Sequence, residues 1–173
     1  MGYEIENRQI LCTAKKDYTK GKTANTTYNE VLEHGKEIRQ GYIKDKTIYG
    51  KILKEFKIKL PTFKIDTFRF RKYGVNYFIT IKGPKKLCKD EMEYKISRAK
   101  FLKYWPLTKG YRIHKKRLEK RIGGFIFELD AFTDRYLLIA ECEVDKVGEL
   151  KMVTKLGKDI TNSSKWSNKN LSK

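Results

Sequence analysis

The chain has 173 residues, of which 39% are apolar, and this fits one domain with a hydrophobic core. Its 40 lysines and arginines outnumber its 21 aspartates and glutamates and give a formal charge of +19, which indicates either a polyanionic partner or a solvated basic surface. No stretch approaches the roughly 20 apolar residues that cross a bilayer, and the start lacks a basic segment followed by an apolar one. Composition therefore predicts neither a membrane span nor a targeting signal.

The three cysteines, Cys12, Cys88 and Cys142, are widely spaced and form no paired metal-ligand pattern. A disulfide framework or a zinc knot is therefore not expected. We expect a reducing, cytoplasmic compartment and a single domain over residues 1–173.

The first third of the chain mixes strand-like and helix-like patterns. Glu4, Glu6 and Arg8 share one side of an alternating run, which is typical of a strand with one charged face. Asn25-Thr26-Thr27 can cap a short helix, and the lysine-rich segment after residue 43 places its apolar residues at a spacing of two. The predicted elements are a strand over 3–11, a helix over 25–35, a strand over 37–43 and an added hairpin or long basic loop over 44–66.

The rest of the chain is richer in strands. Tyr73-Gly74-Val75 is a short turn between two β-rich runs, which predicts a hairpin. Ser97 can cap a helix that ends before Pro106, and turn-like residues separate the last three strand-like runs, which predict an antiparallel meander. The predicted strands cover 67–72, 76–82, 91–96, 111–120, 124–132 and 136–144, the helix covers 98–105, and 156–173 form a C-terminal segment.

Charged pairs at a spacing of two recur along these strands. This spacing puts both side chains on the same face of a sheet. Each pair alone has an ordinary alternative as a solvent-facing strand edge, but Glu141 and Glu143 follow a dense apolar run, which predicts that their strand is buried. The acidic pairs are Glu4/Glu6, Glu91/Glu93, Glu128/Asp130 and Glu141/Glu143, and the basic pairs are Arg69/Arg71 and Lys115/Arg117, with Lys82 on the predicted hairpin.

Burial of so many charges predicts a shared polar cavity. A buried charge is costly unless it is paired or bound to metal. An α+β fold built on a closed antiparallel β-barrel of about eight strands, with short helices packed outside, provides such a cavity. Mg²⁺ binds carboxylate and phosphate oxygens together, while Arg and Lys offset the remaining phosphate charge, so these side chains predict phosphoryl-transfer chemistry.

This series of motifs resembles the triphosphate tunnel metalloenzymes, also called the CYTH superfamily, over nearly the whole chain. The first strand of that family reads Glu-x-Glu-x-Lys, and Glu4, Glu6 and Arg8 occupy these positions, with Arg in place of Lys. The segment 156–161, followed by Trp166-x-Asn168-x-x-Leu171, is similar to the C-terminal segment of the bacterial inorganic triphosphatase branch. The other matches, in family order, are Ile38-Arg39-Gln40-Gly41-Tyr42-Ile43, Arg69-x-Arg71, Ile79-Thr80-Ile81-Lys82-Gly83, Glu91-x-Glu93-x-x-Ile96, Ile113-x-Lys115-x-Arg117, Glu128-x-Asp130 and Ala140-Glu141-x-Glu143.

The resemblance implies a metal-dependent triphosphatase that hydrolyses inorganic tripolyphosphate or a nucleoside triphosphate inside the barrel. Its cofactor would be Mg²⁺ or Mn²⁺, and Arg8 in place of Lys predicts retained binding with an altered rate. By this resemblance, Arg69, Arg71, Lys82, Lys115 and Arg117 bind the triphosphate, Glu4, Glu6, Glu141 and Glu143 hold the metal, and Arg8, Glu91, Glu93, Glu128 and Asp130 act in catalysis.

Three alternatives stay open: an RNA 5′-triphosphatase, a class IV adenylate cyclase, and a non-catalytic protein that binds triphosphates or nucleotides. The predicted interior holds more acids than bases, so the +19 must lie outside it, where an RNA 5′ end or another polyanion could bind. A less favoured alternative is that nucleic-acid bases stack on Tyr49, Phe56 or Phe63. We expect a monomer or homodimer and no membrane partner.

Overall fold

The computed structural model describes residues 2–13, 16–19, 24–84 and 89–173, and within them one antiparallel sheet of eleven strands dominates. Cys88 lies outside the described residues, whereas Cys12 and Cys142 are free and buried. The strands are β1 (Gly2–Glu4), β2 (Glu6–Thr13), β3 (Lys16–Asp17), β4 (Lys36–Tyr42), β5 (Thr67–Tyr73), β6 (Asn76–Lys82), β7 (Lys89–Ile96), β8 (Arg112–Ile122), β9 (Phe125–Phe132), β10 (Leu137–Glu143) and β11 (Lys158–Asp159). The helices are α1 (Ala24–His34), α2 (Tyr49–Glu55), α3 (Arg98–Tyr104) and α4 (Asn168–Leu171), with 3-10 turns η1 (Lys46–Ile48), η2 (Trp105–Thr108), η3 (Val147–Lys151) and η4 (Ser164–Trp166).

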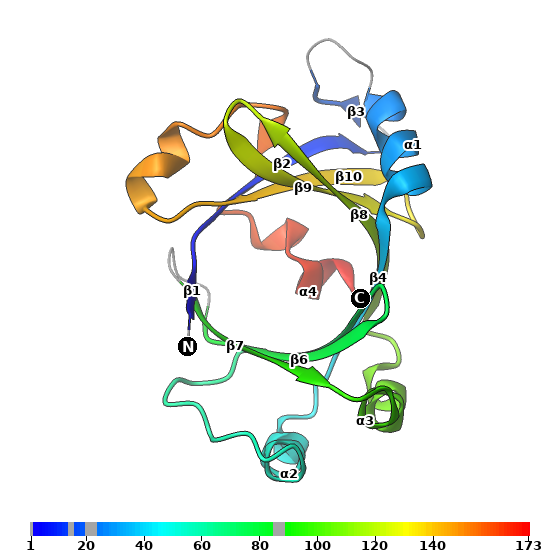
Figure 1. Cartoon of the computed structure of the whole chain (residues 1–173), viewed down its shortest axis with the longest axis vertical. Coiled ribbons are helices and arrows are strands. Elements are labelled where there is room, and N and C mark those ends of the chain that lie inside the picture. The colour runs from blue at the N-terminus through cyan, green and yellow to red at the C-terminus, as the bar shows by residue number, and fades with distance from the viewer. Residues whose placement is uncertain (1, 14–15, 20–23, 85–88) are drawn as a thin grey trace.

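The order of the strands brings the two halves of the first predicted strand to opposite parts of the sheet. The order is β1-β7-β6-β5-β4-β8-β9-β10-β2-β11, so β1 pairs with β7 while β2 pairs with β10. Only Ile5 separates β1 from β2, and Figure 1 shows the strands arranged in a ring. The antiparallel sheet, the 67–82 hairpin and the C-terminal meander that the sequence predicted are confirmed.

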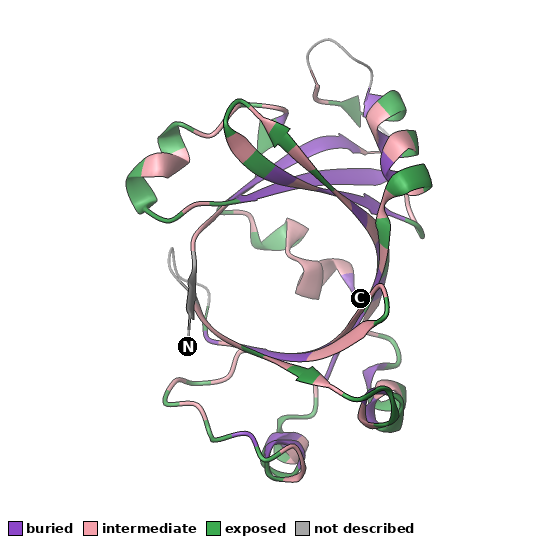
Figure 2. Cartoon of the chain, in the orientation of Figure 1, coloured by how far each residue is buried: buried purple, intermediate pink, exposed green. Residues whose placement is uncertain are grey.

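Two apolar clusters cover the outer face of the ring. One lies under α1, where Tyr28 and Val31 pack against outward side chains of β9 and β10 such as Leu129 and Ala140. The other lies under α2 and α3, against outward residues of β5 and β6. Figure 2 shows the buried residues concentrated on the strands and on the inner sides of these helices. Because the outer face is apolar, the alternating charged residues must point into the ring.

The prediction of a hairpin or basic loop over residues 44–66 is wrong, because this segment contains η1 and α2. The apolar residues of this segment recur at helical spacing and pack into the second outer cluster; they are Tyr49, Ile52, Leu53 and Phe56. This helical spacing determines the structure of the segment, although the apolar residues that follow have a spacing of two. Tyr49 stacks on Phe68 with ring centroids 4.6 Å apart. The aromatic rings of this segment are therefore part of the core and do not form a base-stacking surface.

A third apolar cluster fills one end of the inner face. It joins Ile10, Ile113 and Ile139 from three strands to Ile160, with Trp166 and Leu171 packed against it. The sequence prediction placed all helices outside the sheet, but α4 lies within the ring (Figure 1), because its segment contributes to this inner cluster. The inner face is thus apolar at one end and charged along the rest.

No helix among the described residues is both long and apolar enough to cross a membrane.

Candidate functional site

The charged part of the inner face surrounds a cavity of about 640 Å³. Of the fourteen residues predicted as site residues, twelve line this cavity. The side chain of Glu4 lies outside the described part of the chain, and Asp130 is buried behind the cavity wall with an exposure of 1%. The lining residues from the predicted set are Glu6, Arg8, Arg69, Arg71, Lys82, Glu91, Glu93, Lys115, Arg117, Glu128, Glu141 and Glu143.

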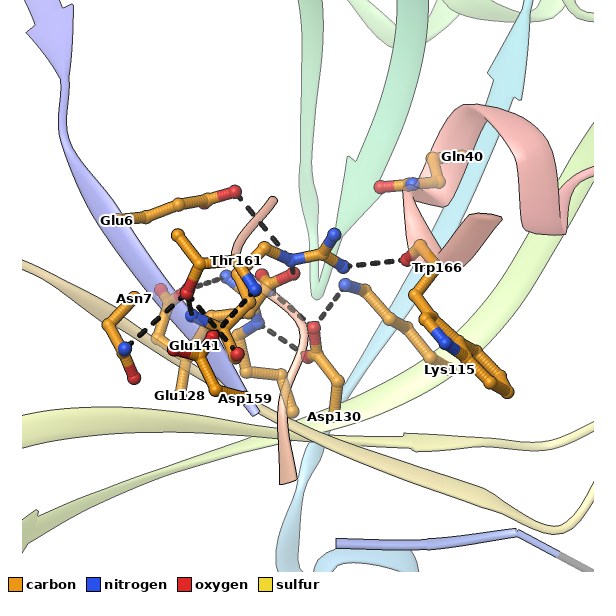
Figure 3. Close-up of polar contacts among 12 residues, drawn as sticks. Glu6, Asn7, Gln40, Lys115, Glu128, Asp130, Glu141, Asp159, Thr161 and Trp166 are labelled. Atoms are coloured by element: carbon orange, nitrogen blue, oxygen red, sulfur yellow. Dashed lines mark hydrogen bonds and ion pairs between the residues drawn. The ribbon is translucent and has the colours of Figure 1, made fainter. Parts of the chain in front are cut away.

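Arg117 is the centre of a buried ionic network on β8, β9 and β10. Figure 3 shows the acidic members of this network, Glu128, Asp130 and Glu141. The Nε of Arg117 donates to Asp130 Oδ1 at 2.7 Å and its Nη2 donates to Glu141 Oε2 at 2.8 Å, while Nη1 contacts Glu128. Burial disfavours the charge on Arg117, but these carboxylates raise its pKa well above the ordinary value. Arg117 therefore stays charged and fixes the positions of three acids.

Arg8 joins the other side of this network. Its Nε donates to Glu141 Oε1 at 2.9 Å and lies 3.6 Å from Glu6, and its Nη2 donates to the backbone oxygen of Trp166 at 3.0 Å. Burial alone would raise the pKa of Glu141, but Arg8, Lys115 and Arg117 hold it well below its ordinary value. Glu141 is thus a permanently ionised carboxylate between cations.

Arg69 and Arg71 form the opposite wall, on β5. Arg71 Nη2 makes two 2.8 Å bonds to the carboxylate of Glu93, and Arg69 Nη2 donates to Thr80 Oγ1 at 3.1 Å. The Nε atoms of both arginines are buried and have no hydrogen-bond partner among the described residues. A buried donor without an acceptor is costly, so an acceptor supplied by a ligand would stabilise this wall.

Two lysines complete the basic set. Lys115 has an exposure of 1% and forms an ion pair with Asp130, and burial lowers its pKa. Lys82 Nζ lies 2.9 Å from Glu91 Oε2, across the β6–β7 pair.

Glu128 contacts Arg117, and burial raises the pKa of its carboxyl group. The cavity therefore contains carboxylates with pKa values shifted in opposite directions, a pattern common in acid–base sites.

The strand register opposes like charges in the cavity. Glu6 lies opposite Glu143 across β2 and β10, and Glu128 lies opposite Glu141 across β9 and β10. Like charges directly opposite are destabilising, and Arg117, which contacts both Glu128 and Glu141, offsets the repulsion of that pair. Among the described residues no three acidic, histidine or cysteine side chains converge into a complete metal group. Carboxylate oxygens, such as those of Glu6, Glu141 and Glu143 on the cavity wall, are the donors that Mg²⁺ and Mn²⁺ prefer, so the chemistry of the donor set fits a hard divalent cation.

The cavity also contains residues that the sequence did not identify as site residues. Gln40 and Tyr42 face inward from β4, and the Gln40 amide donates to Tyr42 Oη at 2.7 Å. Their spacing of two was a usable signal, but neither side chain is charged. The C-terminal residues had no such signal, because only the path of the chain brings them inside. They are Thr161, Ser164, Ser167, Asn168, Lys169 and Asn170, and Asp66, from the segment before β5, lies with them.

Comparisons with known proteins show a similarity to inorganic triphosphatases. No family model matches the chain. An inorganic triphosphatase of Nitrosomonas europaea is 28% identical over 144 residues, which cover 80% of this chain and 85% of that protein. The crystal structure of an inorganic triphosphatase matches with a TM-score of 0.58 and 26% identity, over 98% of this chain and 93% of that one. A candidate adenylate cyclase from Bacillus halodurans, 16% identical with a TM-score of 0.50 over 88% of this chain and 87% of that one, shares the fold.

Proposed function

We propose that this chain is a member of the CYTH superfamily of triphosphate tunnel metalloenzymes and that it hydrolyses a phosphoanhydride bond of a triphosphate bound in the cavity. The observation that carries the proposal is the pair of buried, unpartnered Nε donors of Arg69 and Arg71, on a wall that faces acidic side chains. Phosphate oxygens are the acceptors that such donors match. The similarity to inorganic triphosphatases favours inorganic tripolyphosphate as the substrate.

We infer further that the single domain is a closed barrel whose seam lies at Ile5. The inference is supported by pairing on both sides of this residue, because β1 pairs with β7 and β2 pairs with β10. The backbone oxygen of Ile5 itself accepts a hydrogen bond from Val144 N at 2.9 Å. Closure would exclude bulk water from the cavity, which strengthens every ionic interaction inside it.

Glu6, Glu141 and Glu143 would hold the divalent ion, with Glu4 as a further candidate from β1. When bound, Mg²⁺ or Mn²⁺ would neutralise phosphate oxygens and orient the attacking water. The low pKa of Glu141 suits this role, because it keeps the carboxylate ionised. The opposed register of Glu6 and Glu143 favours a cation between them.

The remaining residues would bind the substrate and accept a proton from the attacking water. Arg69, Arg71, Lys82, Lys115 and Arg117 would hold the phosphate oxygens in line for displacement. Asp130 contacts both Lys115 and Arg117 from behind the wall, so we assign it as a positioning residue. Glu128, with its raised pKa, would accept a proton from the attacking water at a carboxylate oxygen. Glu91 and Glu93 would keep Lys82 and the two β5 arginines in place.

We expect the Arg8→Lys variant to release phosphate faster than the natural protein. Arg8 is held by Glu141 and by the Trp166 carbonyl, which leaves its planar guanidinium little freedom to follow the reacting phosphate. A lysine ammonium is compact and can move to the transferred group. Steady-state phosphate release measures the effect, and an unchanged or lower rate would show that Arg8 does not limit turnover.

The positive charge of the chain favours a second candidate partner outside the cavity. The lining residues comprise seven acidic and seven basic side chains, so the formal +19 lies elsewhere on the protein. Such a surface could guide the 5′ end of an RNA to the cavity, in a cytoplasmic setting that the unpaired cysteines favour.

A substrate panel tests the proposal. Tripolyphosphate, ATP and a 5′-triphosphorylated RNA are each supplied with Mg²⁺ or Mn²⁺, and orthophosphate, pyrophosphate and cyclic AMP are measured together. We expect orthophosphate release that stops with a chelator and returns with the added metal. Preference for the RNA with steep salt sensitivity would favour the RNA triphosphatase, cyclic AMP would favour the cyclase, and absence of every product would contradict all three enzymatic functions.

A further inference from the structure

Residues 44–66, which contain α2, form a lysine-rich segment on the outside of the ring (Figure 1). The segment has seven lysines against three acids, a formal charge of +4. One face of it is buried, because Tyr49, Ile52 and Leu53 pack into the second outer cluster. The opposite face carries six exposed lysines, which we call the lysine face: Lys46, Lys51, Lys54, Lys57, Lys59 and Lys64.

The three acids of this segment are occupied by other groups. Asp45 caps η1, Glu55 accepts a hydrogen bond from Lys103 Nζ at 2.8 Å, and Asp66 accepts one from Lys169 Nζ at 2.9 Å. No ion pair between described residues involves the lysine face. Six cations on one short segment repel one another, and a polyanion bound over them would relieve this repulsion.

Lys57 occupies a position that favours glycine. It follows the end of α2 with a left-handed backbone, at a φ of +56°. The backbone N–H of the next residue, Ile58, donates to Leu53 O at 2.9 Å and closes the end of the helix. Glycine is the usual residue at such a helix end, because a side chain is strained there. The sequence therefore adds a cation to the lysine face at the cost of local strain.

The chemistry of the segment suits a nucleic-acid backbone. Lysine binds phosphate as a point charge, whereas arginine is the common reader of base edges, and the segment contains no arginine. Its rings are packed inward, since Tyr49 stacks on Phe68. Leu60 is 68% exposed within the same segment and offers an apolar contact to a ribose or a base. Inorganic polyphosphate has no apolar part that could use this contact.

We propose that the lysine face binds the phosphate backbone of single-stranded RNA without reading its sequence. The cations lie partly on α2 and partly on the irregular chain around it, and a flexible single strand can follow such a path. The lysine face lies outside the ring, so the proposal does not depend on triphosphatase activity in the cavity. It also assigns a definite place to part of the positive charge of the chain.

Salt-dependent binding measures the number of phosphate contacts. The probe is a fluorescent oligouridylate with a 5′ hydroxyl, which carries no triphosphate, and fluorescence anisotropy gives its dissociation constant. Each contact with a single strand contributes about −0.7 to the slope of log K against log salt, so six lysines predict a slope of about −4. A slope near zero, or no binding at low salt, would overturn the proposal.

A double substitution on α2 tests the location of the site. Lys51→Gln/Lys54→Gln should weaken RNA binding at low salt by at least about tenfold and make the slope less negative by about 1.4. Glutamine and lysine have similar helix propensities, so α2 should persist, and thermal melting checks this. RNA binding that persists unchanged in this folded variant would contradict the proposal.

Lys151→Gln/Lys155→Gln is the matched control. Both lysines are exposed, and they lie on and just after η3, the orange turn that Figure 1 shows away from α2. The control removes the same net charge, so its RNA affinity should stay within about twofold of that of the natural protein. Equal losses in the two double variants would show general attraction by net charge and would overturn a defined site.

Lys57→Gly separates binding from stability. Glycine relieves the left-handed strain, so the Tm should stay the same or rise, while the loss of one cation should make the slope less negative by about 0.7. RNA binding as tight as that of the natural protein would remove Lys57 from the site.

Inorganic polyphosphate and anionic lipid vesicles are tested as other polyanions. Binding of either one without binding of the oligouridylate would overturn RNA as the partner. Because the oligouridylate has no triphosphate, its binding and its loss in Lys51→Gln/Lys54→Gln support the lysine face even if the chain hydrolyses no triphosphate. Hydrolysis of tripolyphosphate without binding of the oligouridylate would leave the proposed function standing and overturn this inference alone.

Discussion

Replacement of Arg117 by methionine is expected to lower the free energy of unfolding by about 3–5 kcal/mol, which is the typical cost of breaking a buried ion pair. Methionine fills much of the same volume but donates no hydrogen bond. Asp130 and Glu141 would lose the bonds from Arg117 while remaining buried, with exposures of 1% and 7%, and would keep only Lys115 and Arg8, respectively, as cationic partners. Urea unfolding followed by circular dichroism measures the loss.

Arg121→Met provides the control for this prediction, because Arg121 lies on the same strand, four residues on, and is exposed. Its effect should stay within about 0.5 kcal/mol. A loss of less than about 1 kcal/mol in Arg117→Met would contradict the central place of Arg117 in the ionic network, since removing one partner of a buried ion pair is strongly destabilising.

Replacement of Arg69 by methionine should reduce kcat/KM by about 10²-fold for the triphosphate that the natural protein hydrolyses fastest, with little change in the free energy of unfolding. The expected size follows from losing a preorganised donor in a water-poor site. Glu93 keeps its two bonds from Arg71, so no acid is left without a partner. Initial-rate kinetics measure kcat and KM separately, and thermal melting checks the fold.

Arg39→Met is the matched control, because Arg39 is exposed on β4, pairs with Glu37 outside the cavity and does not line it. It should leave kcat/KM within about twofold. Equal losses in both variants would indicate general electrostatic attraction of the substrate, and a change of less than about threefold in Arg69→Met would remove Arg69 from the substrate site.

The strand pattern and the inward charges could be predicted from the sequence because both follow from a period of two. Glu141 shows this best. It follows an apolar run whose outward members pack under α1, so its own side chain had to be buried on the inner face. The same rule identified Arg69, Arg71 and Arg117, which come from strands far apart in the chain.

Other features depend on three-dimensional paths that local spacing does not encode. The helical period of Tyr49, Ile52 and Leu53 was hidden in a lysine-rich segment whose following apolar residues have a spacing of two. Asp130 shares a face with Glu128, yet only packing places it behind the wall. The residues of α4 enter the site because apolar anchors at Trp166 and Leu171 draw the segment inside.

The most direct test of the central claim observes the two orphan donors themselves. The Nε–Hε signals of Arg69 and Arg71 can be recorded by ¹⁵N nuclear magnetic resonance and assigned with Arg69→Lys and Arg71→Lys variants. We expect both signals to shift and saturate at one tripolyphosphate per chain in the presence of Mg²⁺, while that of the exposed Arg98 stays in place. Shifts confined to exposed arginines, with Arg69 and Arg71 unchanged, would contradict a triphosphate site in the cavity.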